Sequence, residues 1–330
     1  MVSDKIKRRV LVTGASGQLG RRLVPKLLER GFNVNAHFRS EKKSQRWCPV
    51  GAIPVYGDLL NPDWLDNAVK GCDTVIHSAA MVSLRPHRRE MSYKINVEGT
   101  RAVIDACRKN NVRRLIYISS IVTVGASDNG HPIDEAVDFN LGGFGIPYID
   151  TKRDAERLAL DANSDNLQVV AINPSIMISD PDRELTTKDL KKIPKRVPVY
   201  FDFGINLVDT DDVVEGIISA IDRGTPGNRY LLTGDNIDPE TTFDYAQKYF
   251  GIKKPFVRIP YFILYAAGTL IEVASKLKNK RPRFHRGLAS LSRYRFIYSN
   301  EKAKLELGYS PAPLNHTIDK IMRSLKQYRK

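Results

Sequence analysis

The sequence predicts an α/β fold, in which a doubly wound, seven-stranded parallel sheet carries a smaller, mostly helical C-terminal lobe. Through the first two-thirds of the chain, short apolar runs alternate with helical stretches, as in consecutive βαβ units. The length of 330 residues also exceeds the roughly 100–200 that one domain usually takes. We therefore expect a second lobe above the carboxyl edge of the sheet, where open α/β sheets bind their ligands.

Each predicted strand is a short run of β-branched and apolar residues between turn residues. The seven runs are Val10–Thr13, Val34–Phe38, Ile53–Tyr56, Thr74–Ser78, Leu115–Ser119, Val169–Asn173 and Tyr230–Thr233. Helical periodicity predicts helices over Gln18–Arg30, Met91–Asn110, Tyr148–Ala162 and Asp212–Arg223. This alternation is interrupted by Pro174–Leu207 and Asn236–Lys330. The predicted sheet domain is therefore residues 1–173 and 208–235, and the predicted smaller lobe is residues 174–207 and 236–330.

Charge and cysteine content restrict the class of protein. The net charge of +15 comes from basic residues spread along the chain, so nucleic acid is not expected as a partner. The three cysteines, Cys48, Cys72 and Cys107, are far apart, which predicts no metal site and favours a reducing compartment. Because the basic stretch Met1–Arg9 leads directly into the first strand, we expect no signal peptide and a cytoplasmic location.

A glycine-rich turn follows the first predicted strand and opens the first helix. It reads Thr-Gly-Ala-Ser-Gly-Gln-Leu-Gly, and its glycines allow the backbone to approach a pyrophosphate at the helix N-terminus. In this context the turn predicts a Rossmann-type dinucleotide-binding fold. The predicted cofactor contacts are Thr13, Gly14, Ser16, Gly17, Gln18, Leu19 and Gly20.

The ends of the next strands indicate which dinucleotide binds. Where an NAD enzyme places Asp or Glu on the ribose 2′-hydroxyl, this chain has Phe38 and then Arg39. A guanidinium binds a 2′-phosphate bidentately, so NADPH is the preferred cofactor and NAD the alternative; otherwise Arg39 is a solvent-exposed residue of a basic loop. Further along, Asp58 provides an acceptor for the adenine amino group. The remaining contacts expected on this side are Leu59, Ser78, Ala79 and Ala80.

A tyrosine and a lysine four residues apart predict the catalytic pair. Tyr148 and Lys152 share one face of a helix. A nearby ammonium lowers the pKa of the phenol toward neutrality, as proton transfer requires. The same spacing occurs at Tyr249/Lys253 and Tyr298/Lys302, but only Tyr148 lies between the fifth and sixth predicted strands. Ser120, preferred over Ser119, ends the fifth strand and is expected to hydrogen-bond the substrate carbonyl.

With these motifs in order, the chain resembles the extended short-chain dehydrogenases/reductases. It is most similar to the dihydroflavonol-4-reductase-like branch, which includes 3β-hydroxysteroid dehydrogenases and a hopanoid-associated, epimerase-like group. Further cues are His77 to Ala80, Asn96-Val97-x-Gly99-Thr100, Tyr117 to Ser120 and Asn173-Pro174-Ser175. The resemblance implies catalytic roles for Ser120, Tyr148 and Lys152, cofactor contacts from Tyr148 and Lys152, and nicotinamide contacts from Pro174 and Ser175. It is also compatible with a homodimer.

Two departures bear on the reaction that the resemblance implies. Sugar-nucleotide epimerases of the superfamily usually have Arg before the sixth-strand motif and Tyr-Gly after it, where this chain has Ala171 and Ser175-Ile176. Thr151 replaces the serine that commonly precedes the lysine. The preferred hypothesis is an NAD(P)-dependent enzyme that interconverts a ketone and a secondary alcohol. The alternatives are an epimerase or dehydratase that retains its NAD, and a cofactor-sensing protein without turnover.

Two sets of apolar segments concern the substrate and its source. The predicted substrate pocket is lipophilic or aromatic, with lining segments Met81–Pro86, Ile121–Val124, Phe144–Pro147 and Ile176–Phe203. Separately, Ile259–Val273 is almost wholly apolar and too short to span a bilayer. It is followed by basic residues, Lys276, Lys278, Lys280, Arg281, Arg283 and Arg286. This segment is either a core helix with a solvated tail or a peripheral contact with an anionic membrane.

Overall fold

The computed structural model describes residues 8–179, 199–200, 204–250, 257–278, 280–282 and 284–327. Its main sheet has seven parallel strands in the order β10-β6-β5-β4-β1-β2-β3. These are β1 (Arg9–Thr13), β2 (Asn33–Phe38), β3 (Ile53–Tyr56), β4 (Thr74–His77), β5 (Arg114–Ile118), β6 (Gln168–Pro174) and β10 (Arg229–Leu232). Every predicted strand is thereby confirmed, with bounds that differ by at most one residue.

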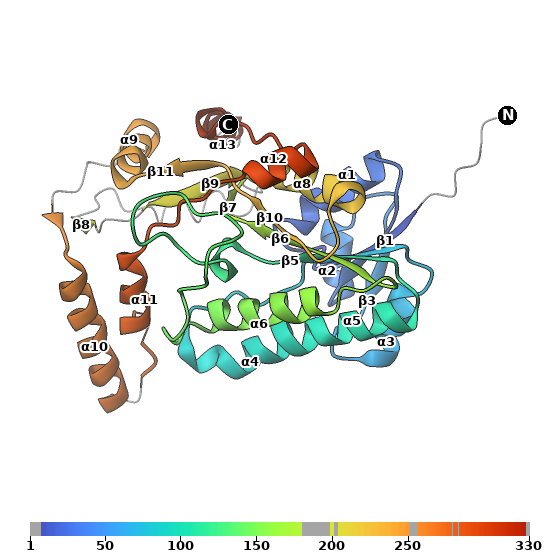
Figure 1. The fold of residues 1–330 in the computed structure, drawn as a ribbon, viewed down its shortest axis with the longest axis horizontal. Helices are drawn as coiled ribbons and strands as arrows, with labels where there is room; N and C mark the ends of the chain where they lie inside the picture. Colours follow the sequence, from blue (N-terminus) through green and yellow to red (C-terminus); the bar gives the residue numbers. More distant parts are fainter. Residues whose placement is uncertain are drawn as a thin grey trace.

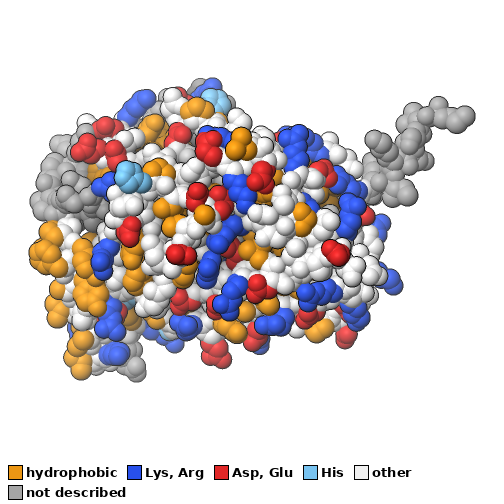
Figure 2. Space-filling view, viewed as in Figure 1, with side chains coloured by type: hydrophobic (Ala, Val, Ile, Leu, Met, Phe, Trp, Pro, Cys, Tyr) orange, Lys and Arg blue, Asp and Glu red, His pale blue; other side chains and the backbone are white. Residues whose placement is uncertain are grey.

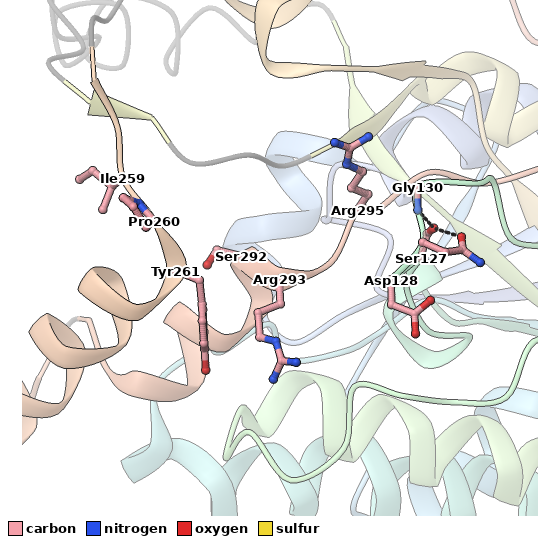
Figure 3. Close-up of a pocket in the computed structure, with 10 residues that line it drawn as sticks. Ser127, Asp128, Gly130, Ile259, Pro260, Tyr261, Ser292, Arg293 and Arg295 are labelled. Carbon is pink, nitrogen blue, oxygen red and sulfur yellow. Dashed lines mark hydrogen bonds between the residues drawn. The ribbon is translucent and has the colours of Figure 1, made fainter.

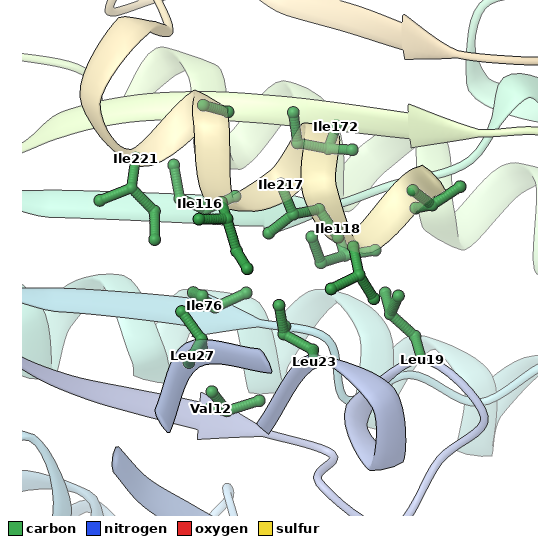
Figure 4. Packing of buried hydrophobic residues seen from close by; sticks show 14 of the residues in the cluster. Val12, Leu19, Leu23, Leu27, Ile76, Ile116, Ile118, Ile172, Ile217 and Ile221 are labelled. Carbon is green, nitrogen blue, oxygen red and sulfur yellow. The ribbon is translucent and has the colours of Figure 1, made fainter. Parts of the chain in front are cut away.

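Helices cover both faces of this sheet because its strands are apolar on both sides. Val10 and Val12 face one layer and Leu11 faces the other. The first layer contains α1 (Gly20–Glu29), α8 (Thr210–Arg223) and α12 (Glu301–Leu307), and Figure 4 shows the packing of α1 and α8 on the strands. The second layer contains α3 (Pro62–Val69), α5 (Gly99–Lys109) and α6 (Pro147–Asp161), below the sheet in Figure 1.

The order of the strands places a crevice beside β1. The chain runs outward from β1 through β2 to β3, and then crosses back to β4 on the other side. Loops after β1 and β4 therefore diverge at the carboxyl edge, which is where doubly wound sheets bind dinucleotides. The short helix α2 (Glu41–Trp47) follows β2.

A π-helical turn interrupts the long helix predicted over Met91–Asn110. The segment consists of α4 (Arg89–Tyr93), the π-helical turn η2 (Lys94–Glu98) and α5. One extra residue in this turn directs Asn96 inward, where it is 1% exposed. Such turns often occur at functional sites, and this one lies against α6.

The smaller lobe is less helical than predicted, since it also contains short strands. A three-stranded sheet has the order β11-β9-β7, with β7 (Ile176–Ile178), β9 (Ile205–Asp209) and β11 (Asp235–Ile237). A two-stranded sheet pairs β8 (Val199–Tyr200) with β12 (Val257–Arg258). The helices are α9 (Pro239–Phe250), α10 (Tyr261–Leu277), α11 (Arg286–Ser290) and α13 (Leu314–Gln327).

Two parts of the C-terminal region pack differently. Leu307 of α12 is buried in the same cluster as the residues of α8 and β10, so α12 packs with the main sheet. By contrast, α10 packs on α11 at the left end of the molecule in Figure 1. No helix within the described ranges is long and apolar enough to cross a bilayer. The division of the chain into a sheet domain and a substrate lobe remains a proposal.

Candidate active site

In the glycine turn after β1, an added Cβ would meet the backbone more closely at two of the glycines than at the third. Gly14 has φ +75°, and a Cβ there would lie 2.9 Å from the Ala79 nitrogen. A Cβ on Gly20 would overlap the Gly14 carbonyl, whereas one on Gly17 would lie 3.2 Å from that carbonyl. Gly17 is exposed just before α1 and donates its own N–H to the Gly14 carbonyl at 2.9 Å, next to the free N–H groups that a helix N-terminus offers to an anion.

A chain of hydrogen bonds connects this turn to the loop after β4. Thr13 Oγ1 accepts from the backbone nitrogens of Ser78 (3.1 Å) and Ala79 (3.2 Å) and lies 2.8 Å from His77 Nδ1. Because a hydroxyl has one proton and two lone pairs, Thr13 donates to His77. His77 therefore carries its proton on Nε2, which lies 3.2 Å from Thr100 Oγ1. Burial, helped by the Lys152 and His37 charges, lowers the pKa of His77 to about 3, so it stays neutral.

A cavity of about 780 Å³ opens between the turn and the ends of β2, β3 and β4. Among the described residues, its acidic lining residue is Asp58, and its cations are Arg39, Lys43, Arg88 and Lys94. His37 Nδ1 is buried beside it without a hydrogen-bond partner in the described part of the chain. These features suit an adenosine ribose with a phosphate. The cavity also brings together the predicted contacts Gly14, Ser16, Gly17, Leu59, Ser78, Ala79 and Ala80.

Two predicted contacts use their side chains elsewhere. Gln18 Nε2 donates to the Met177 carbonyl (3.2 Å), Ser179 Oγ (3.3 Å) and Thr210 Oγ1 (3.2 Å), which ties the turn to the smaller lobe. Leu19 is 5% exposed and packs in the core. For these two residues, only the backbone N–H is available to a phosphate.

Ser120 and Tyr148 lie near each other at the carboxyl edge of the sheet. Ser120 follows β5, and Tyr148 is the second residue of α6, half-buried, with its nitrogen 3.1 Å from the Ser83 carbonyl. Burial raises the pKa of Tyr148, and the neighbouring Ser120 hydroxyl partly offsets this. Ser119 instead points to Thr123, with 3.3 Å between their hydroxyl oxygens. The two adjacent serines therefore face different surroundings.

Lys152 lies one turn after Tyr148 and is 2% exposed. Its ammonium donates to the Tyr117 hydroxyl at 2.7 Å and to the Ile118 carbonyl at 2.6 Å. Burial lowers the pKa of Lys152 to about 7, although the Glu156 charge opposes the shift. Burial, with the charges of Glu156 and Tyr148, raises the pKa of Tyr117 well above its usual value, so Tyr117 stays a neutral hydrogen-bond partner of the ammonium.

Beneath Ser120 is a buried carboxylate that the sequence analysis missed. Glu156 Oε2 accepts hydrogen bonds from Thr123 Oγ1 (2.6 Å) and Asn173 Nδ2 (2.5 Å), and Asn173 also donates to the Ser120 carbonyl at 3.1 Å. Arg229 lies 3.4 Å from the other carboxylate oxygen. The signal was present in the sequence, because Glu156 is four residues after Lys152 and so shares its helix face.

Asn96 is the other positioning residue in this region. Its side chain bonds both backbone groups of Met81 at 2.7 and 3.0 Å, and donates to Thr151 Oγ1 at 2.9 Å. Thr151 then donates to the Pro147 carbonyl at 2.6 Å. The π-helical turn is thus attached both to the loop after β4 and to the first turn of α6.

The sixth strand ends beside the same edge. Pro174 is its last residue, and the Ser175 nitrogen lies 3.3 Å from the Leu232 carbonyl. Ser175 Oγ is buried and has no hydrogen-bond partner among the described residues. A buried hydroxyl of this kind is expected to have a partner, and the amide of a nicotinamide would provide one.

Comparison with known proteins identifies the family of the chain. The model of the 3-beta hydroxysteroid dehydrogenase/isomerase family matches residues 11–216. The chain belongs to that family. It is therefore an extended short-chain dehydrogenase/reductase with an NAD(P)-binding Rossmann fold, and an oxidoreductase that acts on CH–OH and C=O groups.

Relatives are similar to this chain over nearly their whole length. A 4-hydroxy-2-methyl-3-oxo-4-farnesyl-3,4-dihydroquinoline-1-oxide ketoreductase from Stigmatella aurantiaca is 30% identical, covering 92% of each chain. A decarboxylating sterol-4-alpha-carboxylate 3-dehydrogenase from Mus musculus is 30% identical, covering 98% of this chain and 92% of its own. The crystal structure of gox2253 is 30% identical, with TM-score 0.81, covering 98% of this chain and 99% of that one.

Of the other two Tyr-x-x-x-Lys pairs, only Tyr298/Lys302 has both side chains within the described residues. Tyr298 is buried and donates to the Gly125 carbonyl at 2.7 Å, whereas Lys302 donates to Asn228 Oδ1 at 2.7 Å. The two side chains are therefore used for separate structural contacts. In the remaining pair, the side chain of Tyr249 and the whole of Lys253 lie outside the described residues.

A second cavity, of about 370 Å³, lies between the loop after β5 and the start of α10. Figure 3 shows Tyr261 and Arg293 side by side, opposite the loop that carries Asp128. The Arg293 guanidinium lies 5.3 Å from the centre of the Tyr261 ring. The sequence analysis did not identify this cavity, because its walls come from segments more than 100 residues apart.

Proposed function

We propose that this family member interconverts a ketone and a secondary alcohol on a lipophilic or aromatic small molecule, with Tyr148 as the proton donor and acceptor. The proximity of the Ser120 and Tyr148 hydroxyls at the carboxyl edge of the sheet, with the buried Lys152 one turn further along α6, is the observation that carries the proposal. It brings a hydroxyl and a phenol to a common point where a carbonyl oxygen can accept from both.

The proposed roles follow from the chemistry of the three groups. Ser120 orients the substrate oxygen, and Tyr148 transfers the proton. Because burial raises the pKa of Tyr148, the phenolate needs a positive charge nearby. Bringing a phenol from about 10 to about 7 takes about 4 kcal/mol, and Lys152 is the buried cation on the same helix. The bound cofactor supplies or accepts the hydride.

We propose NADPH as the preferred cofactor, with NAD as the alternative. The four cations around one carboxylate support binding of a 2′-phosphate near Arg39. Replacing Arg39 with Asp should shift the ratio of kcat/KM for NADPH over NADH by at least tenfold toward NADH, because a carboxylate repels the phosphate. Steady-state kinetics with both cofactors measures the ratio. An unchanged ratio would remove Arg39 from the site.

A lipophilic substrate is supported by the relatives and by the segments near Tyr148. One relative is a ketoreductase named for a farnesyl-bearing quinoline oxide, and another is a dehydrogenase named for a sterol carboxylate. In this chain, Val82 and Leu84 are 71% and 45% exposed next to Ser83, whose carbonyl accepts from the Tyr148 nitrogen. Much of the predicted lining segment Ile176–Phe203 lies outside the described residues.

The decisive experiment is a screen of hydrophobic ketones and alcohols for NADPH oxidation or NADP reduction. Tyr148→Phe removes only the hydroxyl, so we expect turnover to fall by about 10²–10⁴-fold while NADPH still quenches protein fluorescence with the wild-type affinity. Full activity in Tyr148→Phe would exclude the proposed acid/base role. Lost NADPH affinity would show that the phenol acts in binding.

The retained-cofactor alternative gives a different result in the same screen. The fold is shared with a UDP-glucose 4-epimerase from Thermotoga maritima, TM-score 0.76 at 17% identity, covering 98% of this chain and 100% of that one. An epimerase would purify with NAD bound and show no net absorbance change during turnover. A homodimer and a cytoplasmic location are further proposals, which scattering and cell fractionation would test.

A further inference from the structure

The outer face of α10 is a continuous apolar surface. Phe262, Leu270, Val273 and Leu277 are 68%, 70%, 52% and 84% exposed, and Ile263 adjoins them at 48%. Figure 2 shows hydrophobic side chains gathered along this end of the molecule, over α10. Exposed apolar surface of this extent on one helix marks a site of interaction.

The polarity of α10 is the reverse of that expected for a helix that packs on a core. Its inner face carries Gly268, where a Cβ would lie 2.8 Å from the Arg286 nitrogen. One turn later, Glu272 accepts from that nitrogen at 3.0 Å, and its second oxygen is 3.6 Å from the Arg286 guanidinium. Glycine and a carboxylate thus attach α10 to α11, and the apolar residues remain outside.

Cations lie next to this apolar face. Lys276, Lys278, Lys280 and Arg281 are exposed at the C-terminal end of α10. The 3₁₀ turn η1 (Pro86–Arg88) follows Leu84, whose carbonyl lies 3.0 Å from Nε2 of His285, and its residues Arg85, His87 and Arg88 are exposed. The chain also has a net charge of +15. Positive charge beside an apolar helix is complementary to an anionic lipid surface.

This surface is connected to the candidate active site. His285, at the start of α11, lies with Nε2 3.0 Å from the Leu84 carbonyl. The adjacent Ser83 carbonyl accepts from the Tyr148 nitrogen, and Arg88 lines the cofactor cavity. Residues 82–88 therefore contact both the start of α11, on which α10 packs, and the catalytic tyrosine.

We propose that α10 and residues 82–88 form a docking surface for an anionic lipid bilayer, through which a lipophilic substrate enters. The choice of substrate class rests on the proposed function, but the docking itself does not. The 17 residues of α10 extend about 25 Å, and its polar inner face stays on the protein. The helix therefore lies along the membrane, with its outer face at the boundary of headgroups and acyl chains.

Charge favours a membrane over a second copy of the chain as the occupant. In a two-fold dimer, the same patch would face itself. The two copies of Lys278, Lys280 and Arg281 would add positive charge to one interface, and like charges repel. An anionic bilayer offers apolar depth to the helix and phosphates to the cations at once.

The test is co-sedimentation of the full chain with vesicles of phosphatidylcholine containing phosphatidylglycerol, against pure phosphatidylcholine. We expect binding to the anionic vesicles that weakens with salt. The double variant Phe262→Glu, Leu270→Glu should bind at least tenfold more weakly, because it places carboxylates in the acyl boundary. Lys280→Glu, Arg281→Glu should weaken binding to the anionic vesicles only. The matched control is Leu305→Glu, which changes an equally exposed leucine on α12 and should bind like the wild type.

Each other result has a defined meaning. Binding that is equal in all variants, or absent from anionic vesicles at low salt, would overturn the docking surface. A wild-type dimer that the α10 variant dissociates, without vesicle binding, would overturn it in favour of self-association. Turnover of a water-soluble ketone separates the two proposals. If ketone turnover persists but the protein does not bind vesicles, only the docking proposal is rejected. If the protein binds vesicles but reduces no ketone, only the proposed function is rejected.

Discussion

Lys152 is a buried cation whose charge depends on its immediate partners. Two oxygens accept from it, those of Tyr117 and Ile118, and Glu156 is close enough to favour the charged form. Burial nevertheless lowers its pKa to about 7. The lysine is therefore able to gain or lose its proton near neutrality, which suits a group that controls the charge around a phenol.

The Lys152 pKa predicts a pH-dependent stability. In the folded chain Lys152 releases its proton near pH 7, whereas in the unfolded chain it does so near its ordinary pKa of 10.5. Between these pH values the unfolded state binds more protons, so stability rises with pH. Below about pH 7 the full cost of the buried ammonium remains. Lys152→Met removes this contribution. The difference in unfolding free energy, wild type minus variant, should increase by about 1.4 kcal/mol per pH unit from about pH 7 to 9.

Urea denaturation of both proteins at several pH values measures this difference. Because all other titrating groups are shared, their effects cancel between the two proteins. A difference that stays constant with pH would show that Lys152 keeps its proton throughout this range.

At the scale of elements, the glycines of the turn before α1 differ in how closely they are packed. Gly14 and Gly20 are required by close contacts with the loop after β4 and within the turn itself, whereas Gly17 meets one carbonyl oxygen at 3.2 Å. The Thr13–His77–Thr100 chain then connects this turn to Asn96 of the π-helical turn, which bonds Thr151 of α6. The glycine turn and α6 are thus parts of one hydrogen-bonded frame.

Two alanine variants of this turn should behave differently. Gly20→Ala overlaps a backbone carbonyl, so it should lower the free energy of unfolding by about 3 kcal/mol. Gly17→Ala should change stability by less than about 1 kcal/mol and weaken NADPH binding at least tenfold, because a methyl group obstructs the phosphates. Thermal unfolding without cofactor and fluorescence titration measure the two effects. Wild-type NADPH affinity in Gly17→Ala would place the phosphates elsewhere.

At the scale of the whole molecule, the C-terminal region contributes to the core of the sheet. Ala303, Leu307 and Tyr309 pack in the cluster that contains Leu23 and Ile217. Asn300 Nδ2 also donates to the Thr233 carbonyl at 2.7 Å. Residues near the end of the chain are therefore needed to complete the packing of its first strands.

Two leucines of α12 provide a paired test of this shared core. Leu307 is 1% exposed and Leu305 is 83% exposed. Leu307→Ala should lower the free energy of unfolding by about 3 kcal/mol, and Leu305→Ala by less than about 0.5 kcal/mol. Far-ultraviolet and near-ultraviolet circular dichroism should give one coincident transition for Leu307→Ala. Two separate transitions would show that α12 unfolds independently of the sheet.

The sequence alone determined the sheet and the chemical groups of the candidate site. Apolar runs and their spacing located the seven strands to within one residue, because side-chain periodicity depends on local backbone geometry. The same local logic put Tyr148 and Lys152 on one helix face and the glycine turn at a helix N-terminus. The roles of the site residues, such as binding of a 2′-phosphate by Arg39, stay predictions, because spacing alone does not define a role.

Only the tertiary structure decided which groups meet. Lys152 contacts Tyr117, and Glu156 lies beneath Ser120. The Gln18 side chain holds the smaller lobe, and the outer face of α10 is exposed. All four features depend on segments that are far apart in the chain. Such contacts are set by the register of neighbouring strands and by which helix covers which face, and no local pattern contains that information.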